Sequence, residues 1–192
     1  MIPLYGFSVP QPAIQTHFHS LPQITTVTSM SQPVAIITGG ASGIGLAVTK
    51  HLLAAPYNYK VVIADQVPES VGTPLADSLG PNCLFHRTDV SNYAQQAAVF
   101  AKAFEWGGSR LDFLAANAGI DDRESLYSEG VEVELEGGVK GPRELNLKTM
   151  RVDFDAVIQG LWLFKWWNAK GRNKGDGRKV GKVVITSSAA GL

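Results

Sequence analysis

The amino-acid sequence predicts an α/β fold, a doubly wound parallel sheet with the strand order 3-2-1-4-5. Short apolar runs alternate with longer segments in which apolar residues recur every three or four positions. Strands that are apolar along their whole length are typical of parallel sheets covered by helices on both faces. Right-handed crossovers between consecutive strands then favour the doubly wound order.

The expected elements follow one another from residue 33 onward. The expected strands cover residues 34–38, 60–65, 83–88, 111–117 and 182–188. The expected helices cover residues 45–55, 69–79, 91–106 and 144–168. The last helix is apolar almost all round, which predicts that it is buried. An acidic loop at 120–148 overlaps its start, and the alternation in VEVEL predicts either a small hairpin over a cleft or a solvated surface insertion.

Composition excludes several classes of protein. The 192 residues are 45% hydrophobic and 18% charged, which is typical of a globular domain. Lys plus Arg equals Asp plus Glu at 17 each, which argues against a broad surface for nucleic acid or an anionic membrane. No apolar run reaches the roughly 20 residues of a membrane helix. The single cysteine, Cys83, excludes an intrachain disulfide and indicates a reducing, cytoplasmic location.

Residues 1–32 differ from the rest of the chain. They are rich in Pro, Ser, Thr and Gln and contain no Lys, Arg, Asp or Glu, so they match neither a secretory signal nor a mitochondrial presequence. We expect a disordered extension there, with Met30 as an alternative start, and one domain over residues 33–192. His17 and His19 lack a third ligand and are weak evidence for a metal site.

A glycine-rich turn, TGGASGIG, lies between the first strand and the first helix. Gly39 permits a tight turn, Gly43 permits close approach of a pyrophosphate, and Gly45 permits packing of the helix against the strand. Phosphates there would meet unpaired N–H groups and the positive end of the helix dipole. Ser42 and Ile44 belong to the same candidate cofactor site. The alternative is a turn with a structural role only.

Asp65 ends the second strand, twenty positions after Gly45. A carboxylate at this place accepts hydrogen bonds from the adenosine ribose hydroxyls and repels a 2′-phosphate. No cation follows it in the sequence QVP, so the sequence favours NAD over NADP. The alternative is an aspartate that caps the next turn.

Five motifs in this order resemble the short-chain dehydrogenase/reductase family from residue 33 to the last residue. They are TGGASGIG at 38–45, VVIAD at 61–65, TDV at 88–90, AANAG at 115–119 and VVITSSAAG at 183–191. Within the family, the sequence resembles the NAD-linked, hydroxyprostaglandin-dehydrogenase-like branch. The resemblance implies a Rossmann-like fold and hydride transfer between NAD and a small-molecule secondary alcohol or ketone.

The resemblance also implies roles for further residues. Asp89 would bind the adenine amino group, with Val90 beside the ring; the alternative is that Asp89 is a partner for the next helix. Asn117, with Ala118 and Gly119, would stabilise the sheet and line the floor below the nicotinamide ribose. The alternative for Asn117 is a buried amide that satisfies backbone groups.

The catalytic part of the pattern is incomplete in this sequence. Ser188 aligns with the serine that binds the substrate oxygen, although a serine at a strand end is often a turn residue. Asp153 stands where the family usually has asparagine, as a relay residue or as an ordinary helix carboxylate. None of the five tyrosines is followed four positions later by a lysine, so the family's acid–base pair is absent. We therefore expect a sheet that is incomplete at the C-terminus and a chain that is inactive alone.

The sequence leaves three interpretations of the chain's function open. The first is the cofactor-binding part of an NAD-dependent alcohol dehydrogenase, cut before its Tyr-x-x-x-Lys motif. The second is a non-catalytic NAD-binding or interaction protein that forms a homo-oligomer or pairs with a partner through the aromatic helix 144–168. The third is a fragment without a function of its own.

Overall fold

The computed structural model describes residues 32–121, 124, 130–171 and 180–187. The expected N-terminal extension, with His17 and His19, lies outside the described residues, apart from Gln32. The helices are α1 (Gly43–Leu53), α2 (Glu69–Leu79), α3 (Tyr93–Trp106), α4 (Lys148–Met150), a π-helix (Arg151–Asp155) and α5 (Ala156–Lys170). The strands are β1 (Val34–Thr38), β2 (Lys60–Asp65), β3 (Cys83–Arg87), β4 (Phe113–Ala116), β5 (Glu132–Glu134), β6 (Lys140–Pro142) and β7 (Lys182–Ile185).

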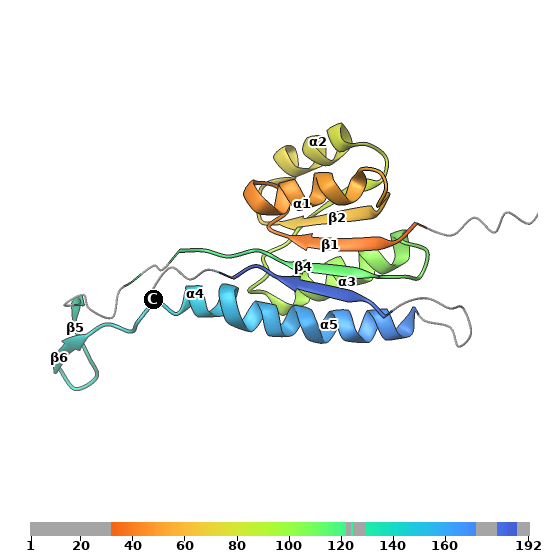
Figure 1. Ribbon diagram of the computed structural model, residues 1–192. Coiled ribbons are helices and arrows are strands. Elements are labelled where there is room, and N and C mark those ends of the chain that lie inside the picture. The colour runs from red at the N-terminus through yellow and green to blue at the C-terminus, as the bar shows by residue number, and fades with distance from the viewer. Residues whose placement is uncertain (1–31, 122–123, 125–129, 172–179, 188–192) are drawn as a thin grey trace, which may run out of the picture. The chain divides into compact units, whose positions relative to one another are not determined.

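The main sheet has the order β3-β2-β1-β4-β7, and all its strand pairs are parallel (Figure 1). This confirms the predicted doubly wound sheet. Its fifth strand is the seventh along the chain because the acidic loop contributes β5 and β6. Ile36 of β1 lies opposite Val62 of β2 and Leu114 of β4, which places β1 at the centre.

The sheet is covered on both faces, as the apolar strands require. Val34 and Ile36 pack in one cluster with residues of α3 and α5, whereas Ala35 and Ile37 pack in a second cluster with α1. In Figure 1, α1 and α2 lie on one side of the sheet and α3 and α5 on the other. The continuous apolar run of β1 is therefore explained by burial on both of its faces.

Helix α3 begins two residues later than the sequence predicts. Its N-cap is Asn92, whose side chain accepts a hydrogen bond from the N–H of Gln95 at 3.2 Å. Ser91 instead donates its N–H and its hydroxyl to Asp89 Oδ1, at 2.9 and 2.7 Å. The capping interaction therefore moves the helix start from Ser91 to Tyr93.

The acidic loop forms a small antiparallel hairpin of β5 and β6. Exposed Glu132 and Lys140 form an ion pair across it at 3.1 Å. The N–H of Arg143 donates to the carbonyl of Val131 at 2.9 Å, which extends the pairing beyond β6. Because the chain is still extended there, the predicted helix 144–168 is wrong at its start, and helical structure begins at Lys148.

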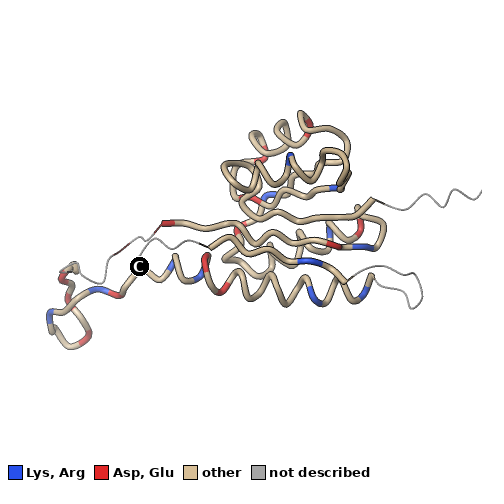
Figure 2. The backbone as a smooth tube through the Cα atoms, in the orientation of Figure 1, with Lys and Arg blue, Asp and Glu red and all other residues tan. Residues whose placement is uncertain are grey.

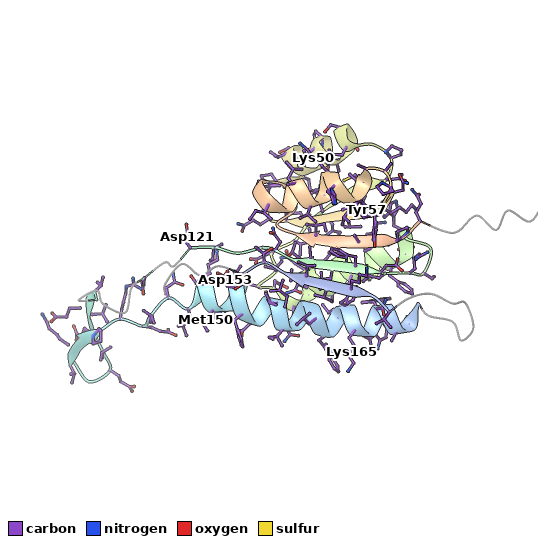
Figure 3. The ribbon with its side chains drawn as sticks, in the orientation of Figure 1. Lys50, Tyr57, Asp121, Met150, Asp153 and Lys165 are labelled. Carbon is purple, nitrogen blue, oxygen red and sulfur yellow. The ribbon has the colours of Figure 1, made fainter. Side chains whose placement is uncertain are left out.

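Helix α5 and the turns before it are buried on one side only. Val152, Ala156, Leu163 and Phe164 are buried against the sheet. A stripe spaced four residues apart is at least half exposed, so the prediction of an entirely buried helix is wrong. Its members are Met150, Phe154, Ile158, Trp162 and Trp166. Figure 3 shows Met150 and Lys165 projecting from the side of the helix opposite the sheet.

Charged residues of both signs are distributed over the two helical layers and the hairpin (Figure 2). In the parts of the chain that the structure describes, no helix has the length and apolar character needed to cross a membrane. The charge pattern shows no band of a single sign along the described backbone.

Candidate functional site

A cavity of about 370 Å³ is lined by residues that follow the carboxyl ends of the parallel strands. Ten of the eleven predicted cofactor residues line it: Gly39, Ser42, Gly43, Ile44, Asp65, Asp89, Val90, Asn117, Ala118 and Gly119. The exception is Gly45, which lies behind the turn. The structure thus brings together segments that are up to 80 positions apart in the chain. Ligands of doubly wound folds bind at this edge of the sheet.

The glycine turn requires glycine because of the backbone conformation at two positions and because of close packing at a third. Gly39 has φ +65° and Gly43 has φ +49°, a backbone conformation that other residues rarely adopt. A Cβ on Gly43 would meet nothing within 4 Å, so this residue borders open space in the cavity. A Cβ on Gly45 would lie 2.1 Å from the Gly39 carbonyl oxygen, which explains its role behind the turn.

The first turn of α1 provides positive charge at the cavity. Its N-cap, Ser42, makes no side-chain capping bond, and no acidic side chain lies in the first turn. The initial N–H groups of a helix have no partner inside the helix, and they lie at the positive end of its dipole. Gly43 and Ile44 carry two of these groups and line the cavity. This arrangement fits an anionic pyrophosphate.

Asp65 combines the two roles that the sequence left open. Its Oδ1 accepts the N–H of Val67 at 3.3 Å, which is the turn-capping role. Its Oδ2 accepts the N–H of Ala41, in the glycine turn, at 3.0 Å. A carboxylate offers about four acceptor positions, so acceptor capacity remains on the side that lines the cavity.

Asp89 and Val90 are held by the start of α3. The N–H of Asp89 donates to Gln95 Oε1 at 2.8 Å. The side-chain amide of buried Gln96 donates to the carbonyl of Val90 and, at 3.1 Å, to the carbonyl of Ala156. These bonds connect Asp89 and Val90, which form one wall of the cavity, to α3, and Gln96 connects that wall further to Ala156 of α5.

Asn117 connects three strand ends. Its side-chain amide donates to the carbonyls of Thr38 and Gly39 at 3.2 and 3.4 Å. Its Oδ1 accepts the hydroxyl of Thr186, which follows β7, at 2.9 Å. The Thr38 hydroxyl in turn accepts the N–H groups of Asn117 and Ala118 at 2.9 and 3.1 Å. The amide therefore satisfies backbone carbonyls and fixes the floor of the cavity.

Asp153 lies in the π-helical segment on the sheet side of the helix (Figure 3). Its Oδ1 accepts the N–H of Ile120 at 3.0 Å and lies near Gly119. Asp153 does not line the cavity, but Gly119 and Ile120, whose backbone it supports, both do. Single π-turns of this kind are frequent at functional sites.

Seven residues that line the cavity escaped the sequence interpretation: Ala64, Gln66, Thr88, Ile120, Lys148, Val152 and Thr186. Thr186 had a detectable signal, because it is a polar residue at a strand end two positions before Ser188. Lys148 and Val152 reach the cavity from α4 and the π-helix, and nothing in the local pattern indicates this.

Ser188 lies outside the described residues. In the described part of the chain, no group of His, Cys, Asp or Glu is arranged to hold a metal.

Comparison with known proteins identifies the family. A family model for short chain dehydrogenases matches residues 33–192. The chain belongs to the short-chain dehydrogenase/reductase family. A short-chain dehydrogenase/reductase of Acremonium egyptiacum, ascJ, is 34% identical over 166 residues, which are 86% of this chain and 51% of that protein. The Arabidopsis thaliana short-chain dehydrogenase reductase ATA1 is 35% identical over 161 residues, 84% of this chain and 51% of that protein.

The chain spans about half the length of these curated relatives. Among solved structures, the RhlG/NADP complex of Pseudomonas aeruginosa matches with a TM-score of 0.60 at 22% identity, over 82% of this chain and 55% of that one. A 3-ketoacyl-(acyl-carrier-protein) reductase from Brucella melitensis, complexed with NADH, matches with a TM-score of 0.52 at 25% identity, over 70% of this chain and 49% of that one. The short-chain dehydrogenase fold is therefore shared by this chain.

Proposed function

We propose that this chain is the cofactor-binding part of an NAD-dependent oxidoreductase that interconverts a small-molecule secondary alcohol and a ketone. The observation that supports this function is the single cavity in which the glycine turn, Asp65, Asp89 and the Asn117–Gly119 floor meet. Bound NAD supplies or accepts the hydride in such enzymes. The residues of this chain bind and orient it.

Each wall of the cavity suits one part of the dinucleotide. The N–H groups at the start of α1 and the open space beside Gly43 suit the pyrophosphate. Asp65 accepts the adenosine ribose hydroxyls, and Asp89 accepts the adenine amino group, with Val90 beside the ring. The floor under the nicotinamide ribose is Asn117 with Ala118 and Gly119.

The proposed preference for NAD over NADP depends on Asp65. A carboxylate at the ribose repels a 2′-phosphate, and the adjacent lining residue, Gln66, supplies no positive charge to bind one. Of the two solved relatives, one is a complex with NADP and the other is a complex with NADH. The preference proposed for this chain therefore follows from its own Asp65.

The catalytic proposal concerns Ser188 and Asp153. Ser188 would donate a hydrogen bond to the substrate oxygen, and Asp153 would hold the backbone at Ile120 beside the cofactor. The 192-residue sequence contains no tyrosine with a lysine four positions later. We therefore propose that this chain by itself binds NAD without completing the proton transfer, in a reducing compartment such as the cytoplasm, where its single cysteine remains free.

Titration of the purified chain with NADH and NADPH, followed by cofactor fluorescence, tests the proposal. We expect a saturable 1:1 complex with NADH and an affinity for NADPH at least about tenfold lower. Absence of binding to either cofactor would refute the cofactor role. Oxidation of secondary alcohols at turnover numbers typical of enzymes, about 1 to 10³ per second, would refute the proposed inactivity.

A second candidate function is interaction with another protein or with a second copy through α5. The specific observation is the exposed stripe that includes Phe154, Ile158, Trp162 and Trp166, because contiguous exposed apolar surface of this kind is typical of interaction sites. A size measurement during NAD titration separates the two candidates. A stoichiometric oligomer or complex supports the interaction role, and a monomer at all concentrations contradicts self-association.

A further inference from the structure

The glycine turn is tied to the end of β2 by two hydrogen bonds. The N–H of Gly39 donates to the carbonyl of Ala64 at 2.8 Å. The N–H of Ala41 donates to the carboxylate of Asp65 at 3.0 Å. The first bond ends on backbone and is independent of the side chain. The second ends on the side chain that the proposed function assigns to the cofactor ribose.

The Asp65 carboxylate is itself held in a fixed orientation. Its other oxygen accepts the N–H of Val67 at 3.3 Å, and its backbone carbonyl accepts the N–H of Thr88 at 2.8 Å. Hydrogen bonds from N–H groups to a carboxylate are stronger than those to neutral oxygens. The Ala41 side chain packs on a buried cluster that contains Ile63, so the middle of the turn is held by a contact and a charge-assisted bond together.

We propose that Asp65 is a positioning residue for the glycine turn in addition to its role at the ribose, an inference that rests on the proposed function. One carboxylate then sets both the choice of cofactor and the shape of the loop that receives the phosphates. A substitution that removes the charge of Asp65 allows a 2′-phosphate to bind. A substitution that also removes the oxygen breaks the hydrogen bond from Ala41. A neutral side chain that keeps the oxygen should therefore bind NADPH better than a smaller one that leaves more room.

Two neutral variants separate the effects. Asp65→Asn removes the charge and retains one acceptor oxygen, which can accept the N–H of Ala41, whereas its NH2 group cannot accept the N–H of Val67. Asp65→Ala removes the charge and the acceptor. Asp89→Ala is the matched control, because Asp89 is the other carboxylate that lines the cavity, and its hydrogen bonds go to Ser91 rather than to the turn.

The first measurement is amide hydrogen exchange of Ala41 in the full chain without cofactor. We expect exchange to accelerate about tenfold in Asp65→Ala, which corresponds to the loss of one hydrogen bond of typical strength. The Asp89→Ala control should stay within about threefold of the parent chain, and Asp65→Asn should exchange faster than the parent but more slowly than Asp65→Ala, because it keeps the bond to Ala41 without the charge. Equal exchange in Asp65→Ala and the parent would overturn the positioning role. If Asp65→Ala does not fold, Asp65→Ser replaces it, because the serine side chain is too short for its hydroxyl to reach Ala41.

The second measurement is the affinity of the two Asp65 variants for NADH and NADPH. We expect both to bind NADH more weakly than the parent, and Asp65→Asn to bind NADPH about tenfold more tightly than Asp65→Ala. Equal or tighter NADPH binding by Asp65→Ala would mean that the carboxylate acts through repulsion alone, and it would overturn the inference. If the parent chain binds neither cofactor, the proposed function fails, while the exchange of Ala41 still decides the positioning role.

Discussion

Alanine at position 43 should abolish cofactor binding and leave the chain folded, whereas alanine at position 45 should disrupt the turn itself. The two glycines are two positions apart and border opposite sides of the turn. A Cβ on Gly43 meets no atom within 4 Å and extends into the cavity. A Cβ on Gly45 meets the Gly39 carbonyl oxygen at 2.1 Å and the Asn117 side-chain nitrogen at 2.7 Å. Gly43→Ala would fill space proposed for the pyrophosphate. Gly45→Ala would collide with atoms of the protein itself.

The magnitudes follow from these geometries. Gly43 has φ +49°, and a left-handed conformation costs an alanine about 1–2 kcal/mol. For a domain of this size, that lowers Tm by about 2–8 °C. Gly45→Ala meets backbone atoms that cannot rotate away, so its loss of unfolding free energy should reach the upper end of the overpacking range, about 3 kcal/mol.

The assay combines a thermal melt with an NADH titration. Gly108→Ala is the matched control, because Gly108 also has a positive φ, +72°, and open space at its Cβ, but it does not line the cavity. We expect Gly43→Ala and Gly108→Ala to lose similar stability and only Gly43→Ala to lose NADH binding. NADH binding by Gly43→Ala at the parent affinity would refute the view that phosphates lie beside this residue.

Three further changes have definite expected results. Thr186→Val removes the hydroxyl that donates to Asn117 Oδ1; NADH affinity should fall about threefold to tenfold with the fold intact, and Thr186→Ser should restore it. Burial raises the pKa of the Cys83 thiol to about 11, so the thiol ionises first in the unfolded chain. Denaturant titrations should therefore show stability falling between pH 9 and 11, and Cys83→Ala should reduce this fall; Tyr59, whose pKa is also raised by burial, contributes to what remains at the upper end of the range. Replacing exposed Trp162 and Trp166 by serine should reduce self-association, measured by sedimentation, without changing NADH affinity; unchanged association would contradict a role for the stripe.

The glycine turn was predictable because it is local. Gly39, Gly43 and Gly45 lie between a strand and a helix that are adjacent in the chain, and the conformation of each depends on its near neighbours. Asp65 was predictable for a related reason, since parallel strands joined by a right-handed crossover place the end of β2 beside the turn after β1. Because the strand order is confirmed, the position of Asp65 beside the glycine turn follows from it.

The start of the long helix was not predictable from periodicity. Arg143 to Leu147 have a composition that suits a helix, but Arg143 pairs with Val131 and the N–H of Asn146 donates to Glu124. These partners come from residues a dozen or more positions earlier, so the local pattern contains no trace of them. Tertiary hydrogen bonds here override a propensity that is weak for each residue.

The exposed side of α5 shows a second limit of the sequence. Trp166 and Trp167 are adjacent, so helix geometry places them on different faces, but they are equally apolar, and the pattern gives no reason to predict which of the two is buried. In the structure Trp167 packs on Phe104, with ring centroids 4.8 Å apart, whereas Trp166 is half exposed. The difference arises from the position of α3, which no local property of α5 encodes.

The floor of the cavity exists only when three strands are paired. Asn117 follows β4, its amide donates to the carbonyls of Thr38 and Gly39 at the end of β1, and its oxygen accepts the hydroxyl of Thr186 after β7. Because β7 pairs with β4 up to Ile185, Thr186 is aligned by the same ladder that places Asn117. A change that weakens the pairing of β7 with β4 would remove a hydrogen-bond donor from Asn117 and the Thr186 side chain from the cavity wall. The pairing of β7 with β4 and the floor of the cavity are therefore physically coupled, and the hydroxyl of Thr186 is the group that connects them.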